Sequence, residues 1–139
     1  MITRSVLLPL DPGAAFTLFT ARIAEWWPPD RRHTGDPASQ IFLLSTGRFY
    51  EQARSGEEID LGRVRAWEPP SRIVLDFYIA TGRDRPTEVE IVFRPRGAST
   101  EVVVTHRATA ASSALWDERA PKYERSWDTV LAALVRAAG

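Results

Sequence analysis

The chain has 139 residues, of which 44% are hydrophobic and 26% charged, as in an ordinary globular protein, and this length suits one domain over residues 1–139. Its 18 basic and 18 acidic side chains cancel, which argues against nucleic acid or an anionic membrane as a partner. The absence of cysteine excludes disulfides, thiolate metal sites and a cysteine nucleophile. No segment reaches the ~18–20 apolar residues of a membrane span, and the first apolar run is too short for a signal peptide. We therefore expect a cytoplasmic protein.

The N-terminal part predicts one strand and two short helices. Thr3 to Leu10 is an apolar run that predicts a strand and ends at Asp11-Pro12. Because Asp favours the N-cap and Pro the first helical position, we expect a helix to begin at Pro12. A second helical turn is expected from Ala21 to Glu25, followed by a surface loop rich in Pro, Asp and Gly from Pro28 to Ala38.

From Ser39 to Arg107 apolar residues recur at every second position, which predicts antiparallel strands. The most specific stretch is Gly62 to Phe77, where two strand-like runs meet at Trp67-Glu68-Pro69-Pro70. Because proline fixes φ and lacks an N–H, this pair should form a rigid corner in a strongly curved sheet. The predicted strands are Ile41 to Leu44, Arg48 to Gln52, Ile59 to Trp67, Arg72 to Ala80, Thr87 to Arg94 and Thr100 to Arg107.

The C-terminal segment changes to helical periodicity. A helix is expected from about Ala120 to Ala138, with Pro121 in its first turn. One face of it carries an apolar stripe made of Tyr123, Trp127, Val130, Leu131, Leu134 and Val135. The order of elements, a strand, two short helices, six strands and one long helix, predicts an α+β domain. We expect the sheet to curl around the long helix and to leave a ligand cavity between them.

Several strings of the sequence are similar to those of one family. In chain order they are AAFTLFTARIAEWWP (Ala14 to Pro28), GRFYE (Gly47 to Glu51), GRVRAWEPPSRIVLDF (Gly62 to Phe77), TEVEIVFRPRGASTEVVVTHR (Thr87 to Arg107) and SWDTVLAALV (Ser126 to Val135). The chain resembles the activator of heat-shock-protein ATPase homologue group of the START-like (SRPBCC) superfamily. The resemblance implies a helix-grip, birch-pollen-allergen-like fold, in which a curved antiparallel sheet of about seven strands wraps around a long C-terminal helix and two short helices follow the first strand.

This resemblance implies a ligand cavity and leaves the activity open. The superfamily includes lipid carriers, hormone receptors, polyketide cyclases and aromatases, and some hydrolases, so function has to be argued from the site. Ser45-Thr46-Gly47 stands where many relatives have a Gly-Gly pair, and Ser126 stands where Gly is common. Both departures are conservative for the fold.

Two polar residues are candidates for chemistry. His106 shares its strand face with Val102 and Val104, so it points toward the core, either as a general acid or base or as a buried histidine hydrogen-bonded to a carbonyl or a hydroxyl. Glu51 could also point inward, paired with Arg63 or Arg65, or acting as a ligand anchor or acid.

His33 lies in the loop over the expected mouth of the cavity, where it would contact either ligand or solvent. With Glu51 and His106 it could form a two-His-one-carboxylate metal site, but the spacing carries no metal-site signature. We therefore predict no metal and no cofactor.

Aromatic side chains are expected to line the cavity and to bind a flat apolar ligand. Trp116, in the stretch before the long helix, is a candidate lid residue whose direction the sequence leaves open. The predicted ligand-binding residues are Trp27, Tyr50, Val64, Leu75, Phe77, Ile91, Val104, His106, Tyr123 and Trp127.

The leading hypothesis is a protein that binds a small hydrophobic or aromatic molecule without strong catalytic machinery, as a monomer or a weak homodimer. The first alternative is a cyclase-, aromatase- or hydrolase-like enzyme with His106 as base and Glu51 or Tyr123 assisting, which requires His106 to face the cavity. The second is a protein-interaction module of the co-chaperone kind, which requires a contiguous exposed apolar patch.

Overall fold

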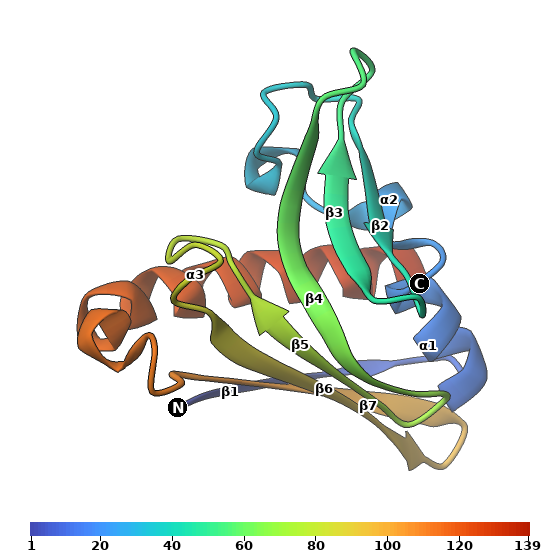
Figure 1. The fold of residues 1–139 in the computed structure, drawn as a ribbon. Helices are drawn as coiled ribbons and strands as arrows, with labels where there is room; N and C mark the ends of the chain where they lie inside the picture. Colours follow the sequence, from blue (N-terminus) through green and yellow to red (C-terminus); the bar gives the residue numbers. More distant parts are fainter.

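Seven antiparallel strands form one sheet, in the order β1-β7-β6-β5-β4-β3-β2, in the computed structural model, which describes residues 1–139 (Figure 1). Strands that follow one another from β2 to β7 are neighbours, and β1 closes the sheet by pairing with β7. The elements are β1 (Ile2–Leu8), α1 (Pro12–Phe19), α2 (Ile23–Trp26), the 3-10 turn η1 (Pro29–Arg31), β2 (Gln40–Leu43), β3 (Arg48–Gln52), β4 (Glu58–Glu68), β5 (Arg72–Phe77), β6 (Thr87–Arg96), β7 (Ser99–Arg107) and α3 (Ser113–Ala138).

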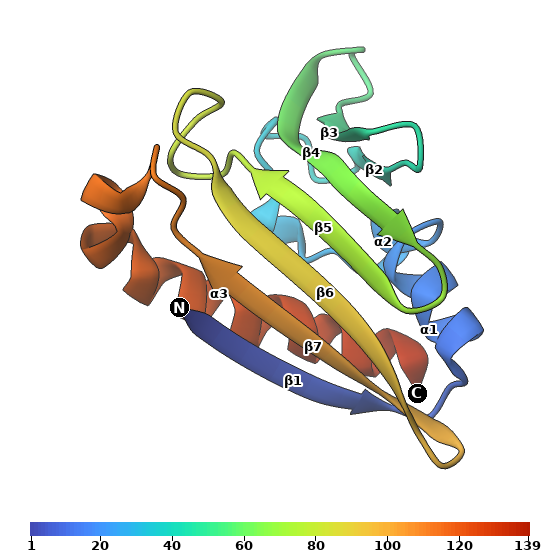
Figure 2. The ribbon, with the colours of Figure 1, turned by 60° about the horizontal axis from the view of Figure 1, so that its bottom comes forward.

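The sheet twists strongly, and α3 lies along one of its faces (Figures 1 and 2). In Figure 1 the strands β2 to β4 stand upright while β1, β6 and β7 run obliquely beneath α3. In both views α1 and α2 lie at the end of the sheet where α3 and the chain terminate. This arrangement confirms the α+β helix-grip fold that the sequence and the resemblance predict.

Alternate residues of the central strands are buried on the sheet face that carries α1 and α3, and they form most of the core. Full burial of a Leu, Ile or Val side chain contributes about 1.5–3 kcal/mol, so these layers hold α3 against the sheet. The residues concerned are Ile73, Leu75 and Phe77 of β5, Val89, Ile91 and Phe93 of β6, and Val102, Val104 and His106 of β7. The middle of the space between sheet and helix is therefore filled by side chains.

The bend of β4 depends on a glycine. The register of pairing between β3 and β4 shifts between Phe49 and Tyr50, and the register between β4 and β5 shifts between Val64 and Ala66. Gly62 is buried here, and a Cβ at this position would collide with the carbonyl oxygen of Asp76. Only glycine allows the two backbones to approach so closely. The Pro69-Pro70 corner follows at the far end of β4, where the backbone N–H of Ser71 donates to the carbonyl oxygen of Glu68 at 2.8 Å.

The predicted start of α3 is wrong by seven residues. The helix begins at Ser113 rather than Ala120, and Pro121 lies inside it instead of in its first turn. The extra turns are held by tertiary contacts, because the Trp116 ring packs 5.4 Å from that of His106 and 5.9 Å from that of Tyr123. Before the helix, the hydroxyl of Ser112 accepts from the backbone N–H of Thr109 at 2.9 Å and closes the turn.

Several strand ends differ from the predictions by one to three residues, whereas the bounds predicted for β3 are correct. β5 ends at Phe77 rather than Ala80, because the next residues form a turn in which Ala80 has a φ of 69° and the N–H of Gly82 donates to Tyr78 O. β6 and β7 extend to Arg96 and back to Ser99, since Gly97 adopts the positive φ of a tight hairpin. None of the helices is long and apolar enough to cross a membrane.

Candidate functional site

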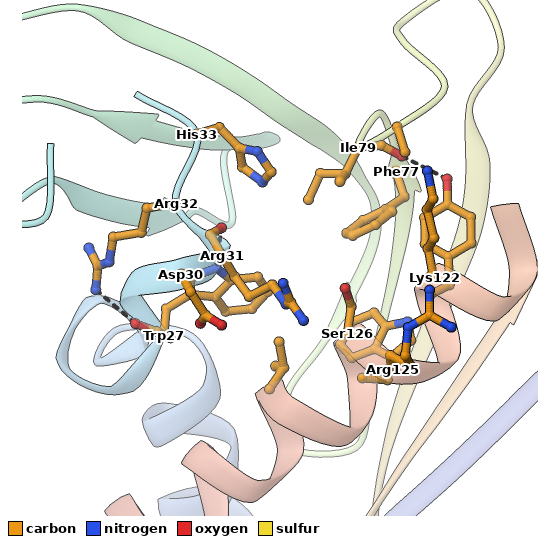
Figure 3. A pocket seen from close by; sticks show the side chains of 14 residues that line it. Trp27, Asp30, Arg31, Arg32, His33, Phe77, Ile79, Lys122, Arg125 and Ser126 are labelled. Atoms are coloured by element: carbon orange, nitrogen blue, oxygen red, sulfur yellow. Dashed lines mark hydrogen bonds between the residues drawn. The ribbon is translucent and has the colours of Figure 1, made fainter. Parts of the chain in front are cut away.

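A pocket of about 380 Å³ lies between three parts of the chain (Figure 3). One wall runs from the end of α2 through η1, the second is the end of β5 with the residues after it, and the third is the middle of α3. The volume falls within the range of small-molecule sites. The lining residues are Trp27, Asp30, Arg31, Arg32, His33, Phe77, Ile79, Ala80, Lys122, Tyr123, Arg125, Ser126, Trp127 and Val130.

Hydrogen bonds to the backbone fix the η1 wall. The indole N–H of Trp27 donates to the carbonyl oxygen of Arg31 at 3.2 Å. The guanidinium of Arg32 donates to the carbonyl oxygens of Ala24 at 3.1 Å and Trp27 at 3.0 Å, and also to that of Ser39. Burial lowers the pKa of the Arg32 guanidinium. Arg32 therefore links the segment that follows η1 to α2 and to Ser39, which precedes β2.

Glu51 holds the same wall from the sheet side. Its carboxylate is fully buried and accepts from the backbone N–H groups of His33 at 2.7 Å and Thr34 at 2.9 Å, and from the Thr34 hydroxyl at 2.6 Å. Burial alone raises the pKa of this carboxyl, but the hydrogen bonds from Thr34 and His33 outweigh it, and the net pKa is lowered. Glu51 is thus an ionised anchor for the loop and does not line the pocket.

The expected ion pair of Glu51 with Arg63 or Arg65 is wrong. Successive side chains of a strand point to opposite faces of the sheet. Glu51 of β3 lies on the buried face, whereas Arg63 and Arg65 of β4 are exposed on the other face. Arg65 instead pairs with Asp76 at 3.4 Å.

His106 lies beside the pocket rather than in it. Its ring is fully buried, its Nδ1 accepts from the indole N–H of Trp127 at 3.0 Å, and its Nε2 lies 2.7 Å from the hydroxyl of Thr87. Because Nδ1 accepts, the proton sits on Nε2 and is donated to Thr87. Burial lowers the pKa of His106 to about 3, so the ring is neutral at physiological pH. Both nitrogens are engaged and neither reaches the pocket, which removes the general base that the enzyme alternative requires.

Four of the predicted ligand-binding residues line the pocket, namely Trp27, Phe77, Tyr123 and Trp127. The Phe77 ring lies 5.9 Å from that of Trp127 and 6.2 Å from that of Tyr123, so these three rings form one wall. The Tyr123 hydroxyl donates to the carbonyl oxygen of Ile79 at 2.7 Å, and burial raises its pKa. Trp27 faces them from the η1 side (Figure 3).

The other six predicted residues lie outside the pocket. Leu75, Ile91 and Val104 are buried within the core, His106 packs against Trp127 of α3, and Val64 packs at the margin of the core. Tyr50 was expected to face the cavity and is on the opposite face of β3 from Phe49 and Glu51. There it stacks on Phe42, with ring centroids 4.9 Å apart, and beneath the guanidinium of Arg48.

Sequence reasoning missed the polar side of the pocket. Arg31, Lys122, Arg125 and Ser126 all line it, and His33 does so while remaining exposed. A helical wheel places residues 122 and 126 next to the predicted Tyr123 and Trp127 stripe, which is the signal that could have identified them. The arginine of the loop carried no comparable pattern.

Three other sequence predictions concern Trp116, a metal site and an exposed apolar patch. Trp116 packs on His106 and Tyr123 and does not line the pocket, so it is no lid. No group of three or more His, Asp or Glu side chains is arranged to hold a metal ion. The exposed large hydrophobic residues, which the interaction-module alternative would need, are Met1, Leu7 and Val135.

A seven-stranded sheet that curls around a long C-terminal helix, with a pocket beside that helix, defines a START-like (SRPBCC) protein of the helix-grip class. The family model described as activator of Hsp90 ATPase homolog 1-like protein matches residues 11–139, and the chain belongs to this family.

Solved structures give the same fold. The self-sacrificing resistance protein CalC from Micromonospora echinospora is 25% identical with a TM-score of 0.75, and the match covers 99% of this chain and 92% of that one. The anthrahydroquino-γ-pyrone synthase Txn09 is 26% identical with a TM-score of 0.59, covering 99% and 94%. The Aha1 dimer from Colwellia psychrerythraea, at 15% identity and a TM-score of 0.61 over 99% and 94%, shows the fold alone. The comparison with curated proteins gave no match.

Proposed function

We propose that this protein binds a small hydrophobic or aromatic molecule in the pocket between η1, the end of β5 and α3, without catalysing a reaction on it. The observation that carries the proposal is the wall formed by Phe77, Tyr123 and Trp127, which faces Trp27 across the pocket. Aromatic walls favour flat apolar guests through buried area and offset or edge-to-face ring contacts. The structural likeness to an anthrahydroquino-γ-pyrone synthase, whose name describes a flat aromatic compound, supports the same class of ligand.

The polar groups of the pocket support binding rather than catalysis. General acid–base catalysis needs a group that exchanges protons near the operating pH and reaches the substrate. His106 is outside the pocket and Glu51 is occupied by the loop backbone. The Tyr123 hydroxyl is committed to Ile79. The only histidine on the pocket is His33, at its exposed edge.

We further propose that the protein works as a monomer or a weak homodimer. The isolated chain already contains all the residues that line the pocket, so ligand binding needs no second copy. Sedimentation velocity from 5 to 200 µM, with and without ligand, tests this. A stable dimer at the lowest concentration would contradict it.

A fluorescence titration with a filled-pocket variant tests the binding proposal. Flavonoids, polyketide-like anthraquinones and the neutral dye N-phenyl-1-naphthylamine are titrated while tryptophan quenching is followed, because Trp27 and Trp127 line the pocket. Ser126→Phe fills the pocket from α3, and Ala132→Phe adds the same ring at an exposed position of the same helix.

We expect saturable binding of at least one compound, weakened tenfold or more in Ser126→Phe and unchanged in Ala132→Phe. Absence of saturable binding to the folded protein would overturn the proposal. Equal binding to both variants would move the ligand away from this pocket and would overturn it as well.

A further inference from the structure

The charges around the pocket are unbalanced. Four cationic side chains line it, Arg31, Arg32, Lys122 and Arg125, against one carboxylate, that of Asp30. The whole chain has equal numbers of basic and acidic residues, so this excess is local. It lies within a short distance of the aromatic wall, because Lys122 and Arg125 flank Tyr123 on α3.

Three of these cations have no protein partner. Arg32 is committed to backbone carbonyls, but Arg31, Lys122 and Arg125 form neither an ion pair nor a side-chain hydrogen bond within the chain. In contrast, ten arginines elsewhere form ion pairs. Asp30, although next to Arg31 in the chain, makes no ion pair. Arg31, Lys122 and Arg125 therefore bring three unpaired cations together where the pocket opens.

Arg31 has the geometry of an anion anchor. Its side chain is half-buried, and its Nε is buried without an acceptor. In Figure 3 the side chain reaches from η1 toward α3, and the hydroxyl of Ser126 points toward the same space. A guanidinium offers a planar fork of donors that matches a carboxylate or another oxyanion. The terminal N–H groups of Arg31 have no acceptor within the chain, and an oxyanion placed between Arg31 and Ser126 would supply one.

On the basis of the proposed function, we propose that the pocket selects an anionic aromatic ligand. Its ring system lies against Trp27, Phe77 and Trp127, and its oxyanion is held by Arg31 and Ser126. Lys122 and Arg125 add positive potential at the rim, which speeds the approach of an anion and favours its retention. The shared chemistry is a flat ring system that carries one carboxylate, sulfonate or ionised phenol.

A pair of dyes that differ by one sulfonate group tests this inference. 8-Anilinonaphthalene-1-sulfonate carries a sulfonate that N-phenyl-1-naphthylamine lacks, and both become fluorescent in an apolar site. We expect the anionic dye to bind about tenfold tighter at low salt, with the preference shrinking as salt rises. Arg31→Gln should remove most of this preference, because it weakens binding of the anionic dye far more than binding of the neutral dye.

Arg94→Gln is the matched control, because Arg94 is exposed on β6, unpaired and away from the pocket. It should leave both affinities unchanged. If Arg31→Gln fails to fold, as judged by near-ultraviolet circular dichroism, the double variant Lys122→Gln/Arg125→Gln on the surface of α3 serves instead and should reduce the preference and its dependence on salt.

The outcomes separate this inference from the proposed function. Equal affinity for the two dyes, or an unchanged preference in the variants, would overturn the inference while ligand binding stands. Failure of both dyes and of every aromatic acid to bind the folded protein would overturn both.

Discussion

Replacing Glu51 by glutamine should loosen the pocket wall that η1 and the following loop form. The wild-type carboxylate accepts three hydrogen bonds from His33 and Thr34 at 2.6–2.9 Å. The amide keeps one acceptor oxygen, but its NH₂ group faces donors. Two charge-assisted hydrogen bonds at ~1.5–3 kcal/mol each are lost, offset in part because a neutral amide is easier to bury. The net cost should be about 2–4 kcal/mol, a large share of the ~5–15 kcal/mol that stabilises a typical domain.

Urea unfolding and amide hydrogen exchange measure this effect. We expect a lower unfolding midpoint for Glu51→Gln and faster exchange of the His33 and Thr34 amides. Glu57→Gln makes the same chemical change at an exposed carboxylate and should stay within ~0.5 kcal/mol of wild type. Arg63→Gln should do so too, because Arg63 does not contact Glu51. A Glu51→Gln protein as stable as Glu57→Gln, with unchanged exchange in the loop, would show that Glu51 does not anchor the loop.

Three further predictions concern the core. The pKa of His106 is about 3 in the folded state against about 6.5 when unfolded, so the unfolded chain binds more protons between these two values and the free energy of unfolding should fall by up to ~1.4 kcal/mol per pH unit as pH drops below 6.5. Urea unfolding at pH 7, 6, 5 and 4 measures this slope, which His106→Gln should reduce. An unchanged slope in His106→Gln would contradict the prediction. Trp127→Phe removes the indole donor to His106 and should cost about 2–4 kcal/mol in the same assay, with a loss under 0.5 kcal/mol contradicting the hydrogen bond. Gly62→Ala places a Cβ against the Asp76 carbonyl and should lower the free energy of unfolding by about 2 kcal/mol or more, measured by thermal unfolding. The control Gly139→Ala should be neutral. Equal melting temperatures for the two variants would exclude the close approach of the β4 and β5 backbones at Gly62.

The fold could be predicted because its signals are local. Period-two alternation marks the central strands, and the string from Gly62 to Phe77 contains both the bend glycine and the proline corner. The start of α3 could not, because Pro121 resembles a first-turn proline. The preceding turns depend on the packing of Trp116 against His106, which only the folded chain brings together.

The site was predicted in its aromatic half only. Trp27, Phe77 and Trp127 lie where the end of the sheet and the helix leave space. Leu75 and Ile91 point the same way but are packed within the core, so an inward direction does not imply a place on the pocket. The position of Tyr50 was an error of strand parity, since it and Glu51 are neighbours and cannot both face inward.

The cationic half of the pocket depends on contacts distant in sequence. Arg31 reaches the pocket because Glu51, from β3, holds the loop that follows it. Nothing in the order of residues from Pro28 to Ala38 indicates which arginine is committed to carbonyls and which is free. That distinction appears only once Arg32 is seen to bind Ala24 and Trp27.

The most direct test of the account is to locate a bound aromatic molecule by NMR. With N-phenyl-1-naphthylamine at saturation, the account predicts intermolecular nuclear Overhauser effects from the dye to the ring protons of Trp27, Phe77 and Trp127, which line the pocket. It predicts none to Leu7, which is exposed on β1 away from it. Effects confined to Leu7 and the outer surface, or none to the three rings at saturation, would contradict the account.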